Sequence, residues 1–236
     1  MRLLLISNST NPGEPYLDYP KNNIREFLGS RSVNVLFIPY AAITFSYDEY
    51  ESRVMERFRE IGHQAASLHH FNNPVKAVRE AEALAVGGGN TWKLLKTLRD
   101  KDLIRIVRKK VLAGMPYIGW SAGSNVACPT IMTTNDMPVV QPDSFTAFNF
   151  VPFQINPHYL DANPAGHAGE TREQRIEEFI EMNPRVYVVG LREGTMLKIE
   201  NKKLDLIGPR NARIFRKGNP PLEVSAGDNL SFLFRN

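Results

Sequence analysis

The chain alternates between short apolar runs and longer segments in which hydrophobic residues recur every three or four positions. Five runs have the near-continuous hydrophobicity of strands that are buried on both faces. They lie at residues 3–6, 33–39, 65–68, 84–86 and 115–118. The segments with helical spacing lie at residues 24–28, 47–61, 74–83, 92–98 and 103–112. This alternation predicts an α/β fold, with a mostly parallel sheet covered by helices on both faces.

The second half of the chain has a less regular pattern. Residues 129–156 are rich in Thr, Pro, Asn and Phe, and we expect loops there with short strands at 137–140 and 150–155. A helix is predicted over 170–182 and a strand over 186–190. Short antiparallel strands, appended to the same core and separated by Gly, Pro and Asn, are expected last. They lie at residues 196–200, 204–207, 213–215, 222–224 and 230–234.

Length and composition suit a single domain over residues 1–236. With 42% hydrophobic residues, the chain can bury one sizeable core. The formal net charge is +4, but Lys and Arg alternate with Asp and Glu without a long basic block, which indicates a solvated surface and no nucleic-acid partner. The only cysteine, Cys128, cannot form an intrachain disulfide, and its small, apolar neighbours predict a buried and unreactive thiol.

No segment of the sequence predicts insertion into a membrane. The apolar run at 3–6 is too short for a secretory signal peptide, and no apolar stretch reaches the ~18 residues of a spanning helix. Together with the lone cysteine, which suits a reducing compartment, this predicts a cytoplasmic protein. The sequence leaves open whether the protein is a monomer or a homodimer.

The most informative stretch is Gly-Trp-Ser-Ala-Gly at residues 119–123, directly after an apolar run. A strand that ends in G-x-S-x-G and turns into a helix has the pattern of a nucleophile elbow, in which glycines permit a sharp turn that exposes the serine. Ser121 is then the candidate nucleophile. The next N–H, on Ala122, would point at an oxyanion, beside the positive end of the new helix. Ordinary strand-turn-helix connections can show the same pattern.

A serine nucleophile needs a base, and histidine has a suitable pKa near neutrality. Of the five histidines, His63, His69 and His70 lie at helix and strand ends in the N-terminal half, where we expect structural or solvated roles. His158 ends a predicted strand and follows a proline that restricts the backbone, so it is the preferred base. His167 lies in a flexible loop and is the weaker candidate.

Two carboxylates qualify as the group that orients the base. Asp136 lies in the chain between Ser121 and His158. Glu193 follows the predicted strand at 186–190, at its carboxyl end, where ligands gather in parallel sheets. This position favours Glu193, although a solvated loop glutamate would look the same.

The glycines at 87–89 follow another predicted strand. Without side chains, their backbone can approach a ligand closely, which makes the N–H groups of Gly88 and Gly89 candidates for the second oxyanion donor. A phosphate cradle is the rival use. It is disfavoured because no G-K-[ST] follows and the spacing is not G-x-G-x-x-G.

Several motifs, in order, resemble the peptidase E family of α-aspartyl dipeptidases. They read VGGGNT at 86–91, GWSAGSN at 119–125, TTNDMP at 133–138, QINPH at 154–158 and GETREQR at 169–175. The likeness extends from Leu3 to about Phe215. It implies a flavodoxin-like fold similar to that of class I glutamine amidotransferases, in which a cysteine occupies the elbow.

This resemblance implies cleavage of dipeptides that begin with aspartate, with Ser121 as nucleophile and His158 as base. Both Glu193 and Asp136 match residues assigned to the site in the family, and Glu193 is preferred as the direct partner of the histidine. No metal or cofactor is implied, and the expected partner is a small acidic peptide.

Arg172 is assigned through the same resemblance to the aspartyl side chain of the substrate. A guanidinium can pair with a carboxylate through two charge-assisted hydrogen bonds. On the residues alone, an exposed helix arginine paired with Glu170 or Glu173 is the alternative.

Two other functions remain open at this point. One is a cyanophycinase-like hydrolase, which also has an elbow serine on this fold but acts on a polymer with β-aspartyl links. The other is a non-catalytic module that binds a small metabolite.

Overall fold

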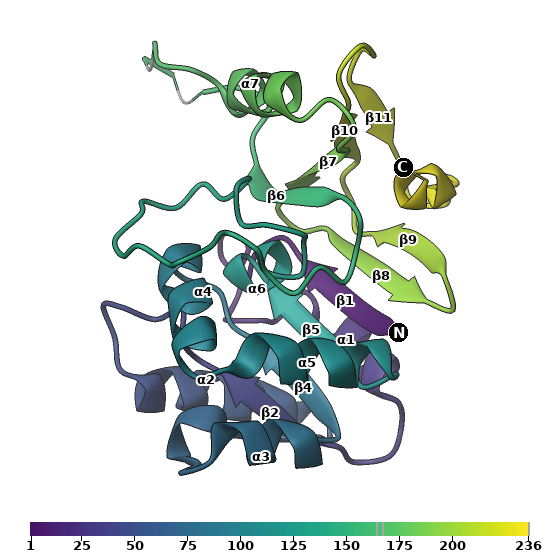
Figure 1. The fold of residues 1–236 in the computed structure, drawn as a ribbon. Helices are drawn as coiled ribbons and strands as arrows, with labels where there is room; N and C mark the ends of the chain where they lie inside the picture. The colour runs from purple at the N-terminus through teal and green to yellow at the C-terminus, as the bar shows by residue number, and fades with distance from the viewer. Residues whose placement is uncertain (164, 167, 236) are drawn as a thin grey trace.

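The computed structural model describes residues 1–163, 165–166 and 168–235. Seven strands form its larger sheet: β1 (Arg2–Ile6), β2 (Asn34–Ile38), β3 (Gln64–Ser67), β4 (Ala83–Val86), β5 (Pro116–Trp120), β8 (Met196–Glu200) and β9 (Lys203–Ile207). Their order is β3-β2-β4-β5-β1-β8-β9 (Figure 1). Neighbours among β1 to β5 are parallel, whereas β8 runs antiparallel to both β1 and β9.

Helices cover both faces of this sheet. They are α1 (Lys21–Leu28), α2 (Tyr47–Glu60), α3 (Pro74–Glu80), α4 (Thr91–Asp100) and α5 (Leu103–Leu112). Leu4 and Ile6 of β1 pack with α1 and α2, whereas Leu3 and Leu5 pack with α3, α4 and α5, because successive strand residues point to opposite faces. The predicted α/β fold with two covered faces is confirmed. None of the described helices combines the length with the hydrophobicity that a bilayer-spanning segment requires.

The structure also contains a second sheet, which the sequence pattern does not predict. Its strands are β6 (Gln154–Tyr159), β7 (Val188–Arg192), β10 (Ala212–Phe215) and β11 (Leu222–Val224), in the order β11-β10-β7-β6. One face packs against α7 (Arg172–Met182), and Figure 1 shows both above the larger sheet. Ile214 and Val224 still reach the apolar core shared with the larger sheet. β10 and β11 therefore contribute to the common core but are not part of the larger sheet.

Three shorter expectations are wrong in detail. Residues 137–140 form no strand; Pro138 lacks a backbone donor, and the Met137 side chain is 76% exposed. The strand expected at 150–155 begins at Gln154 and continues to Tyr159. Residues 231–234 form a 3₁₀ helix instead of a strand, and its three-residue period buries Leu233 together with Leu230.

The elbow depends on two glycines that allow backbone segments to touch. A Cβ atom at Gly123 would lie 2.1 Å from the carbonyl oxygen of Val86, and one at Gly119 would lie 2.4 Å from the carbonyl oxygen of Gly123. Both neighbours are backbone atoms, so no side-chain rotation can relieve the overlap. The two glycines of the G-x-S-x-G pattern are thus required for packing between β4, β5 and the turn.

Replacing Gly123 by Ala should therefore lower the free energy of unfolding by more than ~3 kcal/mol, beyond ordinary core overpacking. Urea unfolding followed by circular dichroism measures the change. Gly218→Ala is the matched control, because that site has a φ of 82° but open space, and only ~1 kcal/mol of backbone strain is expected. Equal decreases in the free energy of unfolding of the two variants would show that backbone overlap at Gly123 is not the cause.

Cys128 lies in the turn that follows the elbow helix and is fully buried. Burial raises the pKa of its thiol to about 12, although the Ile155 N–H donates to the sulfur at 3.2 Å and opposes the shift. Since the thiolate is the reactive form, the native protein should contain an inert cysteine.

We expect iodoacetamide to leave Cys128 unmodified in the native protein at pH 8 and to alkylate it fully in urea. Mass spectrometry of the intact chain measures the extent of alkylation under both conditions. Stoichiometric modification under native conditions would show that the thiol is accessible.

Candidate active site

Ser121 lies at the turn between β5 and the short helix α6 (Ala122–Asn125). Its φ of 52° and ψ of −111° are rare for a residue with a side chain, as expected at a nucleophile elbow. The Ser121 N–H donates to the carbonyl oxygen of Ile6 at 3.0 Å, and the Ser124 hydroxyl donates to the same oxygen at 2.7 Å. The carboxyl end of β1 therefore holds the turn, and Ser121 itself stays only partly buried.

His158 occupies a bulge in β6. The register between β6 and β7 shifts between Pro157 and Tyr159, and His158 has a φ of 54°. Its N–H donates to the Ser7 hydroxyl at 3.0 Å, and that hydroxyl donates to the carbonyl oxygen of Leu191 at 2.7 Å. Sequence reasoning missed Ser7; its signal is a polar residue directly after a buried strand.

The histidine ring bridges Ser121 and Glu193. Nε2 of His158 lies 2.9 Å from the Ser121 hydroxyl oxygen, and Nδ1 lies 2.7 Å from Oε1 of Glu193. A proton on Nδ1 can be donated to the carboxylate, which leaves Nε2 free to accept the serine proton. The structure thus places Glu193, which follows β7, in the position of the orienting acid.

Asp136 lines the same cavity but forms no hydrogen bond with His158. Its Oδ2 accepts from the Thr91 N–H at 2.8 Å, from the Thr91 hydroxyl at 2.6 Å and from the Thr134 hydroxyl at 3.0 Å. Thr91 is the first residue of α4, where the helix dipole favours a negative charge. Asp136 therefore anchors the 129–156 loop to the start of α4.

The glycine loop lies against the elbow. A Cβ atom at Gly88 would lie 3.0 Å from Cβ of Ser121, so a side chain there would crowd the nucleophile. No described residue accepts a backbone hydrogen bond from the N–H of Gly88 or Gly89. The Tyr50 hydroxyl donates to the carbonyl oxygen of Gly88 at 2.9 Å, and burial raises the pKa of Tyr50 to about 12, which keeps it a donor. Sequence reasoning treats Tyr50 only as a core residue of α2.

Arg172 reaches the same cavity, of about 370 Å³, from the first residue of α7. No described residue forms an ion pair or hydrogen bond with its guanidinium: Glu170 pairs with Arg175, and Glu173 pairs with Arg213. Burial, and then Arg175, lower the pKa of Arg172, whereas Asp136 raises it. The cavity thus combines a nucleophile–base pair with a half-buried cation.

The other histidines that the structure describes lie outside this cavity. His63 is buried, its pKa is lowered by burial, and Val33 N–H donates to its Nδ1 at 3.3 Å. His69 and His70 contact carboxylates at the start of α2. His167 lies outside the described residues.

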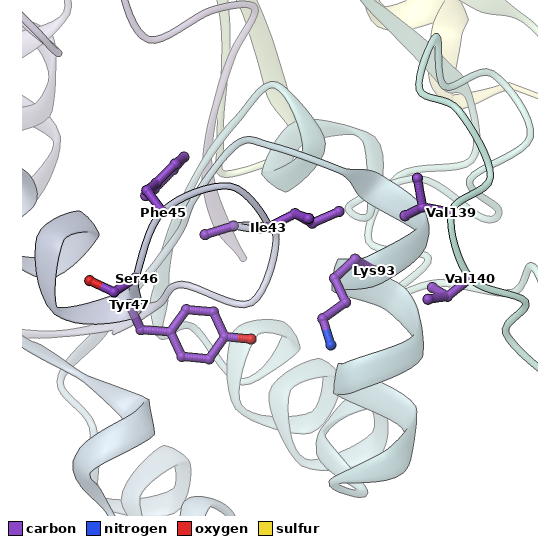
Figure 2. Close-up of a pocket in the computed structure, with 8 residues that line it drawn as sticks. Ile43, Phe45, Ser46, Tyr47, Lys93, Val139 and Val140 are labelled. Atoms are coloured by element: carbon purple, nitrogen blue, oxygen red, sulfur yellow. The ribbon is translucent and has the colours of Figure 1, made fainter.

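A second cavity, of about 490 Å³, lies between the loop that precedes α2, Lys93 of α4 and residues 139–140 (Figure 2). Its lining residues are Ala42, Ile43, Phe45, Ser46, Tyr47, Lys93, Val139 and Val140. Figure 2 shows one charged group there, the amine of Lys93, among mainly apolar side chains. The Ser46 hydroxyl caps α2, where it accepts from the Glu49 N–H at 3.1 Å.

Known proteins match nearly the whole chain. The model of peptidase family S51 matches residues 3–207. Peptidase E from Nostoc sp. is 51% identical over 232 residues, which cover 98% of this chain and 96% of that protein. Peptidase E from Salmonella typhimurium is 43% identical over 227 residues, with coverage of 96% and 99%.

Solved structures support the fold. A putative peptidase E protein from Listeria monocytogenes has a TM-score of 0.66 at 22% identity, covering 88% of this chain and 98% of that one. A peptidase from an acI-B1 actinobacterium has a TM-score of 0.70 at 17% identity, covering 98% and 96%. At these sequence identities, the similarity shows a shared fold and nothing about activity.

The geometry makes a prediction about the two acids. A serine-directed fluorophosphonate should phosphonylate Ser121 in the wild type, with loss of fluoride, and should not label Ser121→Ala. Glu193→Gln should slow labelling by at least about 100-fold, because the amide holds the wrong tautomer of His158. Asp136→Asn should slow it less than about 10-fold, since the amide oxygen can still accept from Thr91. Mass spectrometry measures the labelling rate of each variant. Slower labelling of Asp136→Asn than of Glu193→Gln would identify Asp136 as the acid that orients His158.

Proposed function

Because the chain belongs to peptidase family S51, we propose that the substrates of this serine dipeptidase are dipeptides with an N-terminal aspartate. The observation that carries the proposal is the position of Arg172. Its guanidinium lines the cavity of Ser121 and His158, and no described carboxylate forms an ion pair with it. A substrate carboxylate would supply that ion-pair partner.

The site supports selection by side-chain length. A planar guanidinium binds a carboxylate through two parallel hydrogen bonds, and its reach is set by the packing of α7. Glutamate is one methylene longer, and a methylene alone discriminates by only about 1–3 kcal/mol. Strong preference for aspartate follows if the displaced glutamate carboxylate leaves Arg172 unpaired in the partly buried cavity.

In the proposed reaction, the Ser121 hydroxyl attacks the carbonyl carbon of the aspartyl residue while Nε2 of His158 accepts its proton. Glu193 stabilises the imidazolium that forms. His158 then donates the proton to the leaving amino group, and an acyl-enzyme remains on Ser121. Water releases aspartate by the same proton transfers in reverse.

The oxyanion formed in each step would be held by the Ala122 N–H and by an N–H of Gly88 or Gly89. Backbone donors that make no other hydrogen bond are preorganised for charge that develops only in the transition state. These steps call for no metal or cofactor.

The proposal also covers the cellular compartment, the binding partner and the oligomeric state of the enzyme. The lone, buried Cys128 supports function in a reducing compartment such as the cytoplasm. The partner is a small acidic peptide, bound in one catalytic domain, and homodimer formation is compatible with this site because all its named residues come from one chain.

The wild type should cleave Asp-Leu and leave Glu-Leu, β-aspartyl-leucine and longer peptides that begin with Asp largely intact. Arg172→Ala should lower kcat/KM for Asp-Leu by about 100-fold or more, because charge-assisted hydrogen bonds contribute about 1.5–3 kcal/mol each. Initial rates by chromatography of free leucine measure this.

Arg175→Ala removes the same charge one turn away and is the control; it should change kcat/KM less than about 3-fold, as expected for an exposed ion pair. Preference for β-aspartyl-leucine would instead support a cyanophycinase-like hydrolase. Unchanged Asp-Leu cleavage by Arg172→Ala would refute the role of the arginine.

A further inference from the structure

We propose a binding site for a divalent transition metal, with zinc as the best match, at the start of α2. Its ligands are Asp48, Glu51, His69 and His70. Each residue offers one ligand atom, and the four atoms all lie within 4.8 Å of one another. None of these residues lines the cavity of Ser121, so the site is independent of the peptidase reaction.

Local structure brings the four side chains together. Asp48, in the first turn of α2, and Glu51 are three residues apart and so share one helix face. His69 and His70 are adjacent in the 3₁₀ helix η1 (Leu68–His70), which directly follows β3. Tyr47 packs against the His69 ring with 5.5 Å between ring centroids.

The spacing of the ligand atoms suits a small cation. Nε2 of His69 lies 2.9 Å from Oδ1 of Asp48, and Nε2 of His70 lies 3.6 Å from that oxygen and 2.6 Å from Oε2 of Glu51. Ligands at ~2.0 Å from a tetrahedral ion are themselves about 3.3 Å apart. Shifts of less than about 1 Å in these side chains would therefore create the coordination sphere.

Ser67 holds two of the ligands in place. Its hydroxyl lies 2.6 Å from Nδ1 of His69, which directs Nε2 of that ring toward the carboxylates. Its N–H donates to Oε1 of Glu51 at 2.7 Å, which leaves Oε2 for the metal. Such outer hydrogen bonds are the usual means of fixing histidine and carboxylate ligands. The side chains of Glu51 and His69 are only 13% and 17% exposed, so half of the site is already rigid.

Charge also favours a cation. Within the described chain, Asp48 and Glu51 contact the two histidines and form no ion pair with Lys or Arg. With neutral imidazoles, the cluster carries two negative charges, which a divalent ion would neutralise. Two imidazole nitrogens with two carboxylate oxygens favour zinc over magnesium, since magnesium prefers oxygen ligands.

Isothermal titration of the chelator-treated, full-length protein with zinc chloride tests the site. We expect one zinc ion per chain and no binding heat with magnesium chloride. His70→Ala, at a side chain that is 54% exposed, and Glu51→Gln, which keeps an acceptor for the Ser67 N–H, should each weaken zinc binding at least tenfold.

Two controls make the result specific. Glu56→Gln removes an exposed carboxylate from the same helix and should leave zinc affinity unchanged. His158→Ala should also bind zinc as the wild type does, which separates this site from the Ser121 cavity. Absence of zinc binding, equal affinity in His70→Ala and Glu51→Gln, or loss of binding in His158→Ala would each overturn the proposal.

Discussion

The close backbone contact at the elbow is the constraint on which the site depends. Gly123 lies against the carbonyl of Val86, and only this approach lets the chain leave β5 and enter α6 without a longer loop. The turn forces Ser121 into an unusual backbone conformation, whose cost of about 1–3 kcal/mol must be offset by its surroundings. Hydrogen bonds from Ser121 and Ser124 to the carbonyl of Ile6 contribute to that offset.

The triad forms where the two sheets meet. Ser121 follows β5 of the larger sheet, whereas His158 lies within β6 and Glu193 follows β7 of the smaller one. The Ser7 hydroxyl links them, because it follows β1, accepts from the His158 N–H and donates to the carbonyl of Leu191 in β7. The end of β1 thus contacts both residues, since the Ile6 carbonyl accepts from the Ser121 N–H and the adjacent Ser7 hydroxyl accepts from the His158 N–H.

The hydrophobic pattern of the sequence predicts the helices, strands and turns that neighbouring residues determine. The parallel strands, the covering helices and the G-x-S-x-G turn follow from periodicity and glycine placement. The grouping of later strands into a second sheet does not, because periodicity marks a strand but not the strands with which it pairs. The position of Glu193 at a strand end favours it over Asp136 in the sequence, but its distance of 2.7 Å from His158 comes only from the three-dimensional structure. The segment 230–234 shows a further limit, since its apolar residues suit a strand or a 3₁₀ helix equally well.

The two acids of the cavity have different electrostatic surroundings, and this separates their roles. Asp136 has three hydrogen-bond donors at the start of α4, so its negative charge is held in place before any substrate arrives. That fixed charge opposes the effect of burial on Arg172 and helps to keep the guanidinium charged without forming an ion pair with it. Glu193 instead has His158 as its hydrogen-bonded partner, and its side chain is 34% exposed. One carboxylate is therefore hydrogen-bonded at the start of α4 and acts on Arg172 through its charge, whereas the other is hydrogen-bonded to His158.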